Sequence, residues 1–395
     1  MKSNTRGYLS GWPVLILLFI SWGVTRAVLL ADSFSGEVPL DVTAYFRWAE
    51  DLTSGSQPAL DTAFVYPPGS ALVFLMPSFM PPELYFRTFT LLAVLSDLAI
   101  LISLWLFVRN GTKATQVAPW AWVALGFAAG PLMYQRYDIF AALLGVLALL
   151  SIKRPALSGG IAGLGFLVKL WPEISILGVP KEKMIRALSA NVAVILVGWL
   201  TLEVIFGNSF AFVGNVLNKG TSVEALAAYP FLIGRALSTS HIVTGQFGSW
   251  EVIGPGVSVT ATIITAIGVL LLIGIFLLRL SGKLDHASPG DIVLIGVLIF
   301  VASHKINSLQ YGIWIAAMTA AALAFTNSRA LGPSVLLALM LITADSVIWT
   351  NFVSFISGNL LMLGYQGLRL LLLLAALIWL SVQIFMDGKF QTVTK

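Results

Sequence analysis

Long apolar runs recur along the whole chain and are separated by short polar segments. Several runs reach about eighteen residues with few charges, which is the length and composition of a helix that crosses a bilayer. Such a run must be helical because a lipid-exposed backbone has to satisfy its own hydrogen bonds. The pattern predicts an all-α, polytopic membrane protein with about ten full spans, at residues 12–30, 83–108, 118–134, 138–152, 187–206, 257–280, 289–303, 306–326, 331–349 and 362–386.

The apolar stretch between Arg154 and Lys181 is too long for one span and too short for two. We expect a short helical hairpin here, with Lys169, Trp171 and Pro172 at its turn. The alternative, one tilted span, would invert the orientation of every later segment. With the hairpin, the predicted inner segments hold 14 Lys and Arg residues and the outer segments hold six. Cytoplasmic loops carry such an excess of positive charge, so we expect both termini in the cytoplasm.

This topology places the main polar segments on the outer face. The first outer loop, residues 31–67, has six acidic residues between Asp32 and Asp61 and only Arg47 to balance them. The second, residues 208–256, contains apolar stretches that predict interfacial helices rather than a separate soluble domain. Residues 69–80 are too short to span and predict a helix that dips into the membrane. A solvated and charge-biased surface would explain these loops without any chemical role.

Composition narrows the classes of function. The chain is 58% apolar and 10% charged, and its net charge of +5 is typical of cytoplasmic loops facing anionic lipid rather than of nucleic-acid binding. The absence of cysteine excludes disulfides and thiolate metal sites, and three scattered histidines form no zinc-like cluster. We therefore expect no metal or other cofactor. No internal repeat or linker is visible, so residues 1–395 are treated as a single domain of the cell membrane.

Asp41 is a candidate for proton transfer. It follows the first span and precedes Tyr45 by one helical turn, so the carboxylate and the phenol share a face. A glycosyl transfer needs a carboxylate to take the proton of the acceptor hydroxyl, and cations to stabilise the departing phosphate. The simpler interpretation of such an aspartate is a helix cap or a solvated charge. Further along, Tyr66-Pro67-Pro68 predicts a rigid turn where the chain re-enters the membrane.

Charged residues near membrane depth are costly unless they are paired, so they tend to mark functional sites. The positively charged ones are candidates for binding a phosphate. Lys169 lies in the hairpin turn, where it can bind an anion, snorkel to the interface or pair with Glu173. Arg136 and Asp138 begin the fourth predicted span at an outer corner. They predict either a local salt bridge or a contact with substrate.

His304 and Lys305 follow the end of an outer helix, where positive charge can hold a lipid phosphate. Four further charges lie within or near the predicted spans. We interpret these as packing partners rather than ligands: Arg26, Asp97, Asp345 and Arg369.

Five short motifs occur in order along the chain. They are Asp-x-x-x-Tyr at 41–45, Tyr-Pro-Pro at 66–68, Arg-Tyr-Asp at 136–138, Lys-x-x-Pro at 169–172 and Lys-Ile-Asn-Ser-x-Gln-Tyr-x-x-Trp at 305–314. In this order, on the predicted outer side, they resemble glycosyltransferase family 87, the polyprenol-phosphate-mannose-dependent α-1,2-mannosyltransferases of the GT-C superfamily. The resemblance covers roughly residues 8–320.

The resemblance implies a GT-C fold and an inverting hexosyl transfer on the extracytoplasmic face. The donor would be a polyprenyl-phosphate sugar, and the acceptor a lipid-linked glycan among the membrane lipids. The absence of any Asp-x-Asp fits such a donor, which needs no metal to hold a nucleotide diphosphate. By matching position, Asp41 is the candidate base, with Lys169, His304 and Lys305 around the donor phosphate. The substrate-binding candidates are Tyr45, Tyr66, Arg136, Asp138, Lys169, Lys305 and Gln310.

The late outer turn departs from the family pattern. Members often have Ser-Pro-Gln-Tyr or a pair of histidines there, whereas this chain has Ser308-Leu309-Gln310-Tyr311 and only His304. The departure leaves the base open between Asp41 and His304. It also leaves the sugar open between mannose and arabinofuranose.

Two other classes of function fit a polytopic chain. A transporter or flippase of a lipid-linked or small substrate would need its charged sites to be reachable alternately from both sides. The missing internal repeat disfavours a secondary transporter. Only the order of the motifs argues against a third class, a membrane assembly protein without catalytic activity.

Overall fold

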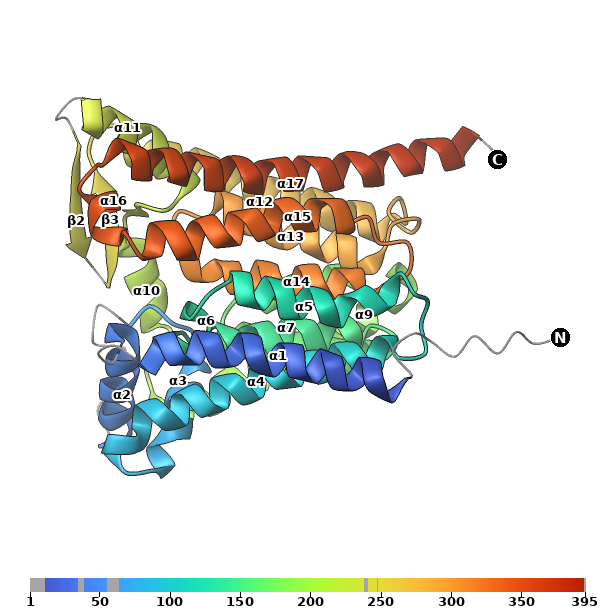
Figure 1. The fold of residues 1–395 in the computed structure, drawn as a ribbon, viewed down its shortest axis with the longest axis horizontal. Helices are drawn as coiled ribbons and strands as arrows, with labels where there is room; N and C mark the ends of the chain where they lie inside the picture. The colour runs from blue at the N-terminus through green and yellow to red at the C-terminus, as the bar shows by residue number, and fades with distance from the viewer. Residues whose placement is uncertain (1–10, 35–38, 55–63, 238–240, 247, 394–395) are drawn as a thin grey trace.

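The computed structural model describes residues 11–34, 39–54, 64–237, 241–246 and 248–393. Most of these residues are helical, and the long helices lie side by side along one axis (Figure 1). Helix α1 (Trp12–Phe34) begins and helix α17 (Leu360–Val393) ends at the same end of this bundle. We call this the terminal end and the opposite one the loop end.

Among the described residues, six helices are long and apolar enough to cross a membrane. Together with shorter apolar helices they confirm the predicted class, an all-α polytopic membrane protein. The six are α1, α4 (Tyr85–Val108), α9 (Lys181–Phe206), α12 (Val257–Leu280), α15 (Leu331–Ile342) with its π-helical continuation η9 (Thr343–Trp349), and α17.

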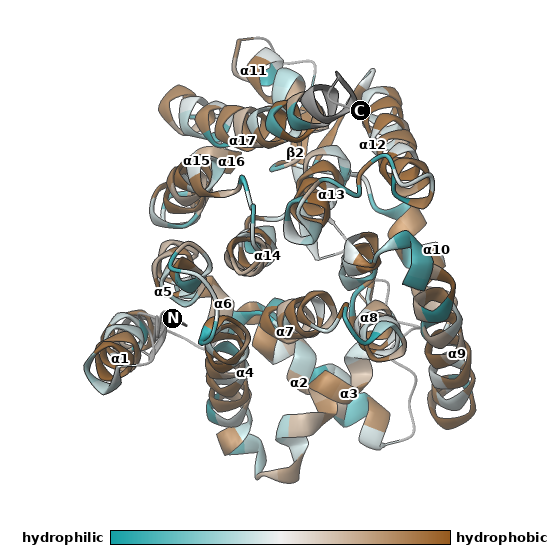
Figure 2. Cartoon of the chain, turned by 90° about the vertical axis from the view of Figure 1, so that its right-hand side faces the viewer, coloured by the Kyte–Doolittle hydropathy of each residue, from teal (hydrophilic) through white to brown (hydrophobic). Residues whose placement is uncertain are grey.

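The other four predicted spans are shorter helices: α5 (Ala118–Ala128), α7 (Asp138–Leu150), α13 (Pro289–Ser303) and α14 (Gly312–Leu323). A helix rises about 1.5 Å per residue, so about 15 residues fall short of a hydrocarbon core of about 30 Å. Every residue of α14 is buried. Figure 2 shows α13 and α14 inside the bundle and α1 and α9 at its edge. These apolar runs pack against protein, and a sequence pattern does not distinguish such a run from one that faces lipid.

The predicted hairpin consists of α8 (Pro155–Val168) and the 3₁₀-helix η6 (Trp171–Gly178). The chain breaks between them at Lys169, whose backbone is extended. A Cβ atom at Gly165 would lie 2.5 Å from Cβ of Pro172, so the two short helices approach more closely than any other residue would allow. The break fixes Lys169 at the point where the two helices meet.

Short elements gather at the loop end, among them α2, α3, α10, α11 and α16 (Figure 1). Parts of both predicted outer loops, residues 35–38 and 55–63 in the first and 238–240 and 247 in the second, lie outside the described residues. The bounds of the short elements are α2 (Leu40–Thr53), α3 (Ser70–Leu75), η3 (Met76–Phe79), η4 (Pro82–Leu84), η5 (Thr115–Val117), α6 (Leu132–Gln135), α10 (Ala211–Asn218), η7 (Leu226–Ala228), α11 (Tyr229–Leu237), η8 (Leu309–Tyr311) and α16 (Phe352–Ile356).

A small antiparallel sheet in the second outer loop was not expected from the sequence. Its strands are β1 (Thr221–Ser222), β2 (Ile242–Gln246) and β3 (Ser249–Ile253), in the order β1-β3-β2. The segment was predicted to form interfacial helices, and α10 and α11 are helical. The alternation of apolar and polar residues in β2 and β3 extends over only five residues each, which is too short to stand out among apolar segments.

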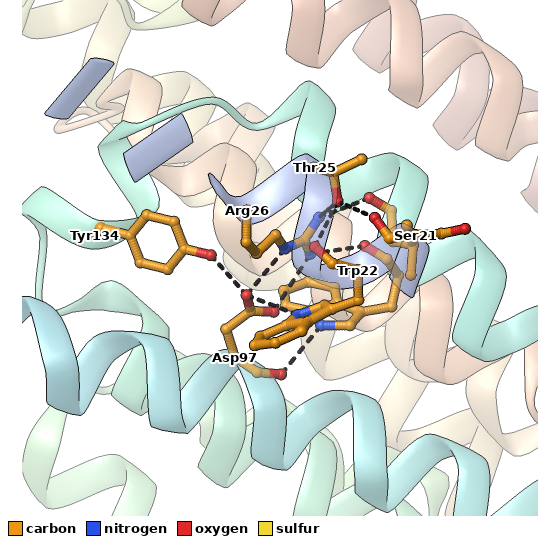
Figure 3. Close-up of polar contacts among 8 residues, drawn as sticks. Ser21, Trp22, Thr25, Arg26, Asp97 and Tyr134 are labelled. Atoms are coloured by element: carbon orange, nitrogen blue, oxygen red, sulfur yellow. Dashed lines mark hydrogen bonds and ion pairs between the residues drawn. The ribbon is translucent and has the colours of Figure 1, made fainter. Parts of the chain in front are cut away.

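A buried polar cluster joins α1 to the bundle (Figure 3). Nε of Arg26 lies 2.9 Å from Oδ2 of Asp97 on α4, and the two residues are 2% and 0% exposed. Trp22 and Tyr134 donate further hydrogen bonds, of 3.0 and 2.7 Å, to the same carboxylate oxygen. One face of α1 is exposed, with Ile16, Ile20 and Val24 on it, whereas Leu18 and Leu29 pack into the core. The cluster adds specific polar contacts to this apolar packing between α1 and its neighbours.

Candidate active site

A cavity of about 1110 Å³ lies at the loop end of the bundle. Its walls come from α2, the corner between α6 and α7, the hairpin turn, the small sheet and the segment that follows α13. Pockets that bind small molecules usually measure roughly 300–1,000 Å³. This cavity is therefore large enough for a sugar, a phosphate and part of a lipid chain.

Helix α2 places Asp41 at the cavity. Asp41 lies in the first turn, where the helix dipole favours a carboxylate, and the buried face of the helix carries Tyr45 and Trp48. The Asp41 carboxylate forms an ion pair with the guanidinium of Arg136. That guanidinium also lies 5.8 Å from the centre of the Trp349 ring. Asp41, Arg136 and Trp349 all line the cavity, so a paired carboxylate and cation face its interior.

Lys169 brings a second cation to the cavity. Its Nζ lies 2.7 Å from Oδ1 of Asp138, which is fully buried and also accepts a hydrogen bond of 2.6 Å from Nε1 of Trp314. This pairing replaces two that the sequence allowed, Arg136 with Asp138 and Lys169 with Glu173. Lys169 lines the cavity and Asp138 lies behind it. Asp138 thus holds the ammonium in place from the protein interior.

Aromatic rings surround the Lys169 ammonium. Its Nζ lies 4.4 Å from the ring centre of Tyr137, 5.0 Å from that of Trp314 and 5.6 Å from that of Tyr311. Trp171, at the hairpin turn, stacks on Trp314 with 5.2 Å between ring centres. Cation–π contacts favour the charged form of a lysine. The same rings give the cavity an apolar wall on which a sugar face or a lipid chain can pack.

His304 and Gln310 line the cavity from the segment after α13. Nδ1 of His304 lies 2.7 Å from the carbonyl oxygen of Ile306 and 3.2 Å from the Ile306 backbone nitrogen, so it can donate to the former or accept from the latter. In the tautomer with the proton on Nδ1, the Nε2 lone pair is free to act as an acceptor. Burial, together with the charges of Lys305 and Lys169, lowers the pKa of His304, which favours the neutral imidazole at pH 7. The Oε1 atom of Gln310 is buried and has no hydrogen-bond partner among the described residues.

The remaining predicted residues differ in position. Tyr66 lines the cavity, whereas Tyr45 is fully buried and stacks on Phe74, with ring centres 4.5 Å apart. Lys305 does not line the cavity. Its Nζ donates to the carbonyl oxygens of Lys219, at 2.7 Å, and of Leu217, at 3.2 Å. Tyr45 and Lys305 therefore support the cavity walls from behind.

Sequence reasoning missed a segment that we call the strap, residues 219–224, which follows α10 and contains β1. Lys219 and Glu224 lie at its two ends, are only 6% and 8% exposed, and both line the cavity. Burial lowers the pKa of Lys219 to about 8 and raises the pKa of Glu224 to about 7. In the sequence these residues are isolated charges in a long outer loop. Only the packing of the strap against the 304–308 turn brings them to the site.

A comparison with known protein families matches residues 64–303, more than half of the chain, to glycosyltransferase family 87. The chain belongs to this family. Comparisons with curated proteins and with solved structures give no match.

Membership of glycosyltransferase family 87 confirms the family that the motif order predicts and makes the protein a membrane glycosyltransferase. The matched region includes Tyr66, Arg136, Lys169 and the strap. Asp41 precedes this region and His304 follows it, yet the fold brings both to the same cavity. In this family 87 member one cavity thus combines the carboxylate of Asp41 with the cations Arg136 and Lys169.

Proposed function

We propose that this protein transfers mannose from a polyprenyl-phosphate donor to a lipid-linked glycan acceptor on the extracytoplasmic face of the cell membrane. One observation carries the proposal. Asp41, Arg136, Lys169 and His304, which are far apart in the sequence, all line one cavity of about 1110 Å³ at the loop end.

In the proposed reaction, the Asp41 carboxylate takes the proton of an acceptor hydroxyl. The hydroxyl oxygen then attacks the anomeric carbon of the donor sugar as the bond from that carbon to the phosphate oxygen breaks. The bonding electron pair leaves with the phosphate, and attack from the opposite face inverts the anomeric configuration. The ion pair with Arg136 orients Asp41 before the acceptor binds. An oriented base and a bound hydroxyl lower the barrier chiefly through proximity.

Cations in the cavity stabilise the charge that develops on the departing phosphate. Lys169 is held by Asp138 at 2.7 Å, and Lys219 lines the cavity from the strap. Charge-assisted hydrogen bonds from fixed donors are stronger in a water-poor site than in solution. His304, neutral at pH 7, is better suited to accept a proton than to bind phosphate, so it is the alternative base if Asp41 serves only to position Arg136.

The distribution of charge supports the proposed side of the membrane. The segments rich in Lys and Arg belong to the terminal end by the predicted topology, whereas the cavity lies at the loop end. Positive charge is enriched on the cytoplasmic side of membrane proteins. The cavity would then open outside the cytoplasm, where a polyprenyl-phosphate sugar can reach it.

The rim of the cavity also suits a lipid donor. Leu40 lines the cavity although 85% of its surface is exposed, and Phe352 and Trp349 line it as well. An exposed leucine at the mouth of a polar site would be covered by the lipid chain of a bound donor.

The test is sugar transfer by the purified protein in lipid nanodiscs. Polyprenyl phosphate carrying radiolabelled mannose or radiolabelled arabinofuranose is supplied with lipid-linked mannoside acceptors, and the products are separated by thin-layer chromatography. We expect label from the mannosyl donor to move to the acceptor only when the protein is present. Transfer from the arabinosyl donor alone would correct the sugar, and no transfer from either donor would contradict the proposal.

A further inference from the structure

The cavity contains a second carboxylate, Glu224, that the proposed transfer does not use. Its backbone carbonyl oxygen accepts hydrogen bonds from Nη2 of Arg369, at 2.5 Å, and from Nε2 of Gln366, at 2.8 Å. Both donors lie on α17 and are buried, with exposures of 3% and 0%. Two polar side chains of a membrane-spanning helix therefore fix the main chain at the point where Glu224 projects.

The rest of the strap is held just as firmly. Ser222 donates from its backbone N–H to the carbonyl oxygen of Lys305, at 3.0 Å, and from its hydroxyl to that of Asn307, at 2.8 Å. Val223 donates from its N–H to the carbonyl oxygen of Trp250, at 3.0 Å. The backbone of the strap is therefore fixed from three directions. The Glu224 side chain, only 8% exposed, lines the cavity from this fixed segment.

No ion pair among the described residues explains the burial of Glu224, although the charges of Arg369 and Arg136 act on it. Within the described part of the chain it forms no ion pair with a lysine or arginine nitrogen, and the nearby Arg369 guanidinium is bonded to its carbonyl oxygen. Burying a carboxylate outside an ion pair is costly, and a buried carboxylate that lines a cleft is a candidate for binding a ligand. Burial also raises the pKa of Glu224 to about 7. Hydrogen bonds from its own backbone and from Ser222 lower the pKa, but burial is the larger effect.

Trp250 provides an apolar surface in the same cavity as Glu224. It lies on β3 opposite Gly245 of β2, and 41% of its surface is exposed. Trp250, Gly245 and Gly248 all line the cavity, and the indole lies over the backbone of Gly245. A carboxylate and a partly exposed aromatic ring in one cavity match a sugar, whose hydroxyls donate hydrogen bonds and whose C–H face packs on the ring.

We propose that Glu224 and Trp250 form the subsite for the acceptor sugar. The carboxylate accepts hydrogen bonds from hydroxyls next to the reacting one, and the indole packs against the apolar face of the ring. A donor phosphate would be repelled by Glu224, and we assign it to the cations Arg136 and Lys169, which line the same cavity. The inference rests on the proposed function, because it assigns the acceptor of that same transfer.

The experiment is steady-state kinetics of the full-length protein in nanodiscs, with octyl mannoside as the acceptor and polyprenyl-phosphate mannose as the donor. For Glu224→Gln we expect the KM for octyl mannoside to rise at least tenfold, with the donor KM and the slow hydrolysis of donor without acceptor unchanged. Trp250→Ala should raise the same KM, and Trp250→Phe should restore most of it. Glu203→Gln is the matched control, since Glu203 lies at the same end, does not line the cavity and accepts a hydrogen bond from the backbone N–H of Ser209.

The outcomes separate this inference from the function on which it rests. An unchanged acceptor KM in both Glu224→Gln and Trp250→Ala, with wild-type transfer intact, overturns the subsite and leaves the transferase. A rise in donor KM with no change in acceptor KM overturns it as well. If Glu224→Gln fails to fold, the acceptor KM of Trp250→Ala and Trp250→Phe tests the subsite, because these changes affect a partly exposed side chain. Absence of transfer by the wild type would instead contradict the proposed function.

Discussion

The carboxylate of Asp41, in the first turn of α2, forms an ion pair with the guanidinium of Arg136 at the corner before α7. The two side chains are partly exposed, at 27% and 14%, and both face the same cavity. An exposed surface pair would contribute little. This pair instead connects the first outer segment to the bundle and presents a carboxylate to the space where a substrate would lie. The ion pair thus brings one carboxylate of the outer acidic loop, that of Asp41, to the cavity.

Lys169 and Lys305 should differ when each is changed to methionine, because only Lys169 lines the cavity. We expect Lys169→Met to raise the donor KM about ten- to a hundredfold, since a charge-assisted contact to phosphate contributes roughly 1.5–3 kcal/mol. It should also lower stability, because Asp138 is left buried without its cation. Lys305→Met should alter donor KM less than about threefold.

Donor titrations of the two variants at saturating acceptor provide the measurement, with thermal unfolding as the record of stability. Equal effects of both substitutions on donor KM would show that Lys305 also reaches the phosphate. The sequence places both lysines near the outer surface. In the structure, Lys305 instead donates to the carbonyl oxygens of Leu217, in α10, and Lys219, in the strap.

The pH dependence of kcat/KM should show an acid limb for the acceptor and an alkaline limb for the donor, both near neutrality. Burial raises the pKa of Glu224 to about 7, so protons neutralise it as the pH falls and acceptor kcat/KM should drop up to tenfold per pH unit. Burial lowers the pKa of Lys219 to about 8, so donor kcat/KM should fall as the pH rises above that value. The other charges facing Glu224 are Arg369 and Arg136, which stay cationic across this range.

Glu224→Gln should abolish the acid limb for the acceptor, and Lys219→Met the alkaline limb for the donor. Rate measurements from pH 5.5 to 9.5 in nanodiscs check both, at roughly half-unit steps. An acid limb that persists in Glu224→Gln would assign that titration to another group, with His304 as the first to be examined.

Arg26 should matter for stability and not for chemistry. Arg26→Met leaves Asp97 buried without its cation, which costs about 3–5 kcal/mol. We expect a lower unfolding temperature in detergent and unchanged transfer per folded molecule, because the cluster lies outside the cavity. The double variant Arg26→Met with Asp97→Leu should recover much of the loss. A fall in specific activity with normal stability would show that α1 takes part in the reaction.

Orientation can be tested directly, since the chain has no cysteine. Single cysteines at the exposed positions Ser54 and Asn218 of the loop end should react with a membrane-impermeant thiol reagent added to intact cells. Cysteines at the exposed positions Thr112 and Thr326 should react only after the membrane is opened. Labelling of Thr112→Cys from outside would invert the proposed topology.

Much of the fold could be predicted because local patterns determine it. The long apolar runs, the break at Lys169 and the order of the outer motifs are visible in the sequence, and the family match agrees with the motif order. The partners of the charges could not be predicted, because they depend on how helices pack. Arg136 pairs with Asp41 rather than its neighbour Asp138, and Asp138 with Lys169.

The strap is a second part of the site that the sequence does not predict. Lys219 and Glu224 lie in a segment without a recognisable motif, and their hydrogen-bond partners come from the 305–307 turn, β3 and α17. Contacts between segments so far apart in sequence leave no local signal. A sheet whose longest strands have five residues also leaves little local signal within an apolar loop.

The most direct test of the account is the turnover of Asp41→Asn in nanodiscs with saturating polyprenyl-phosphate mannose and octyl mannoside. Asparagine keeps the shape of the side chain but cannot accept the proton. We therefore expect kcat to fall by about 10²–10⁴ while donor binding and protein yield are retained. Glu50→Gln and Asp51→Asn, on the same helix, should stay within a few-fold of wild type. Near-normal turnover in Asp41→Asn would contradict the central claim, and loss of turnover in His304→Ala alone would move the base to His304.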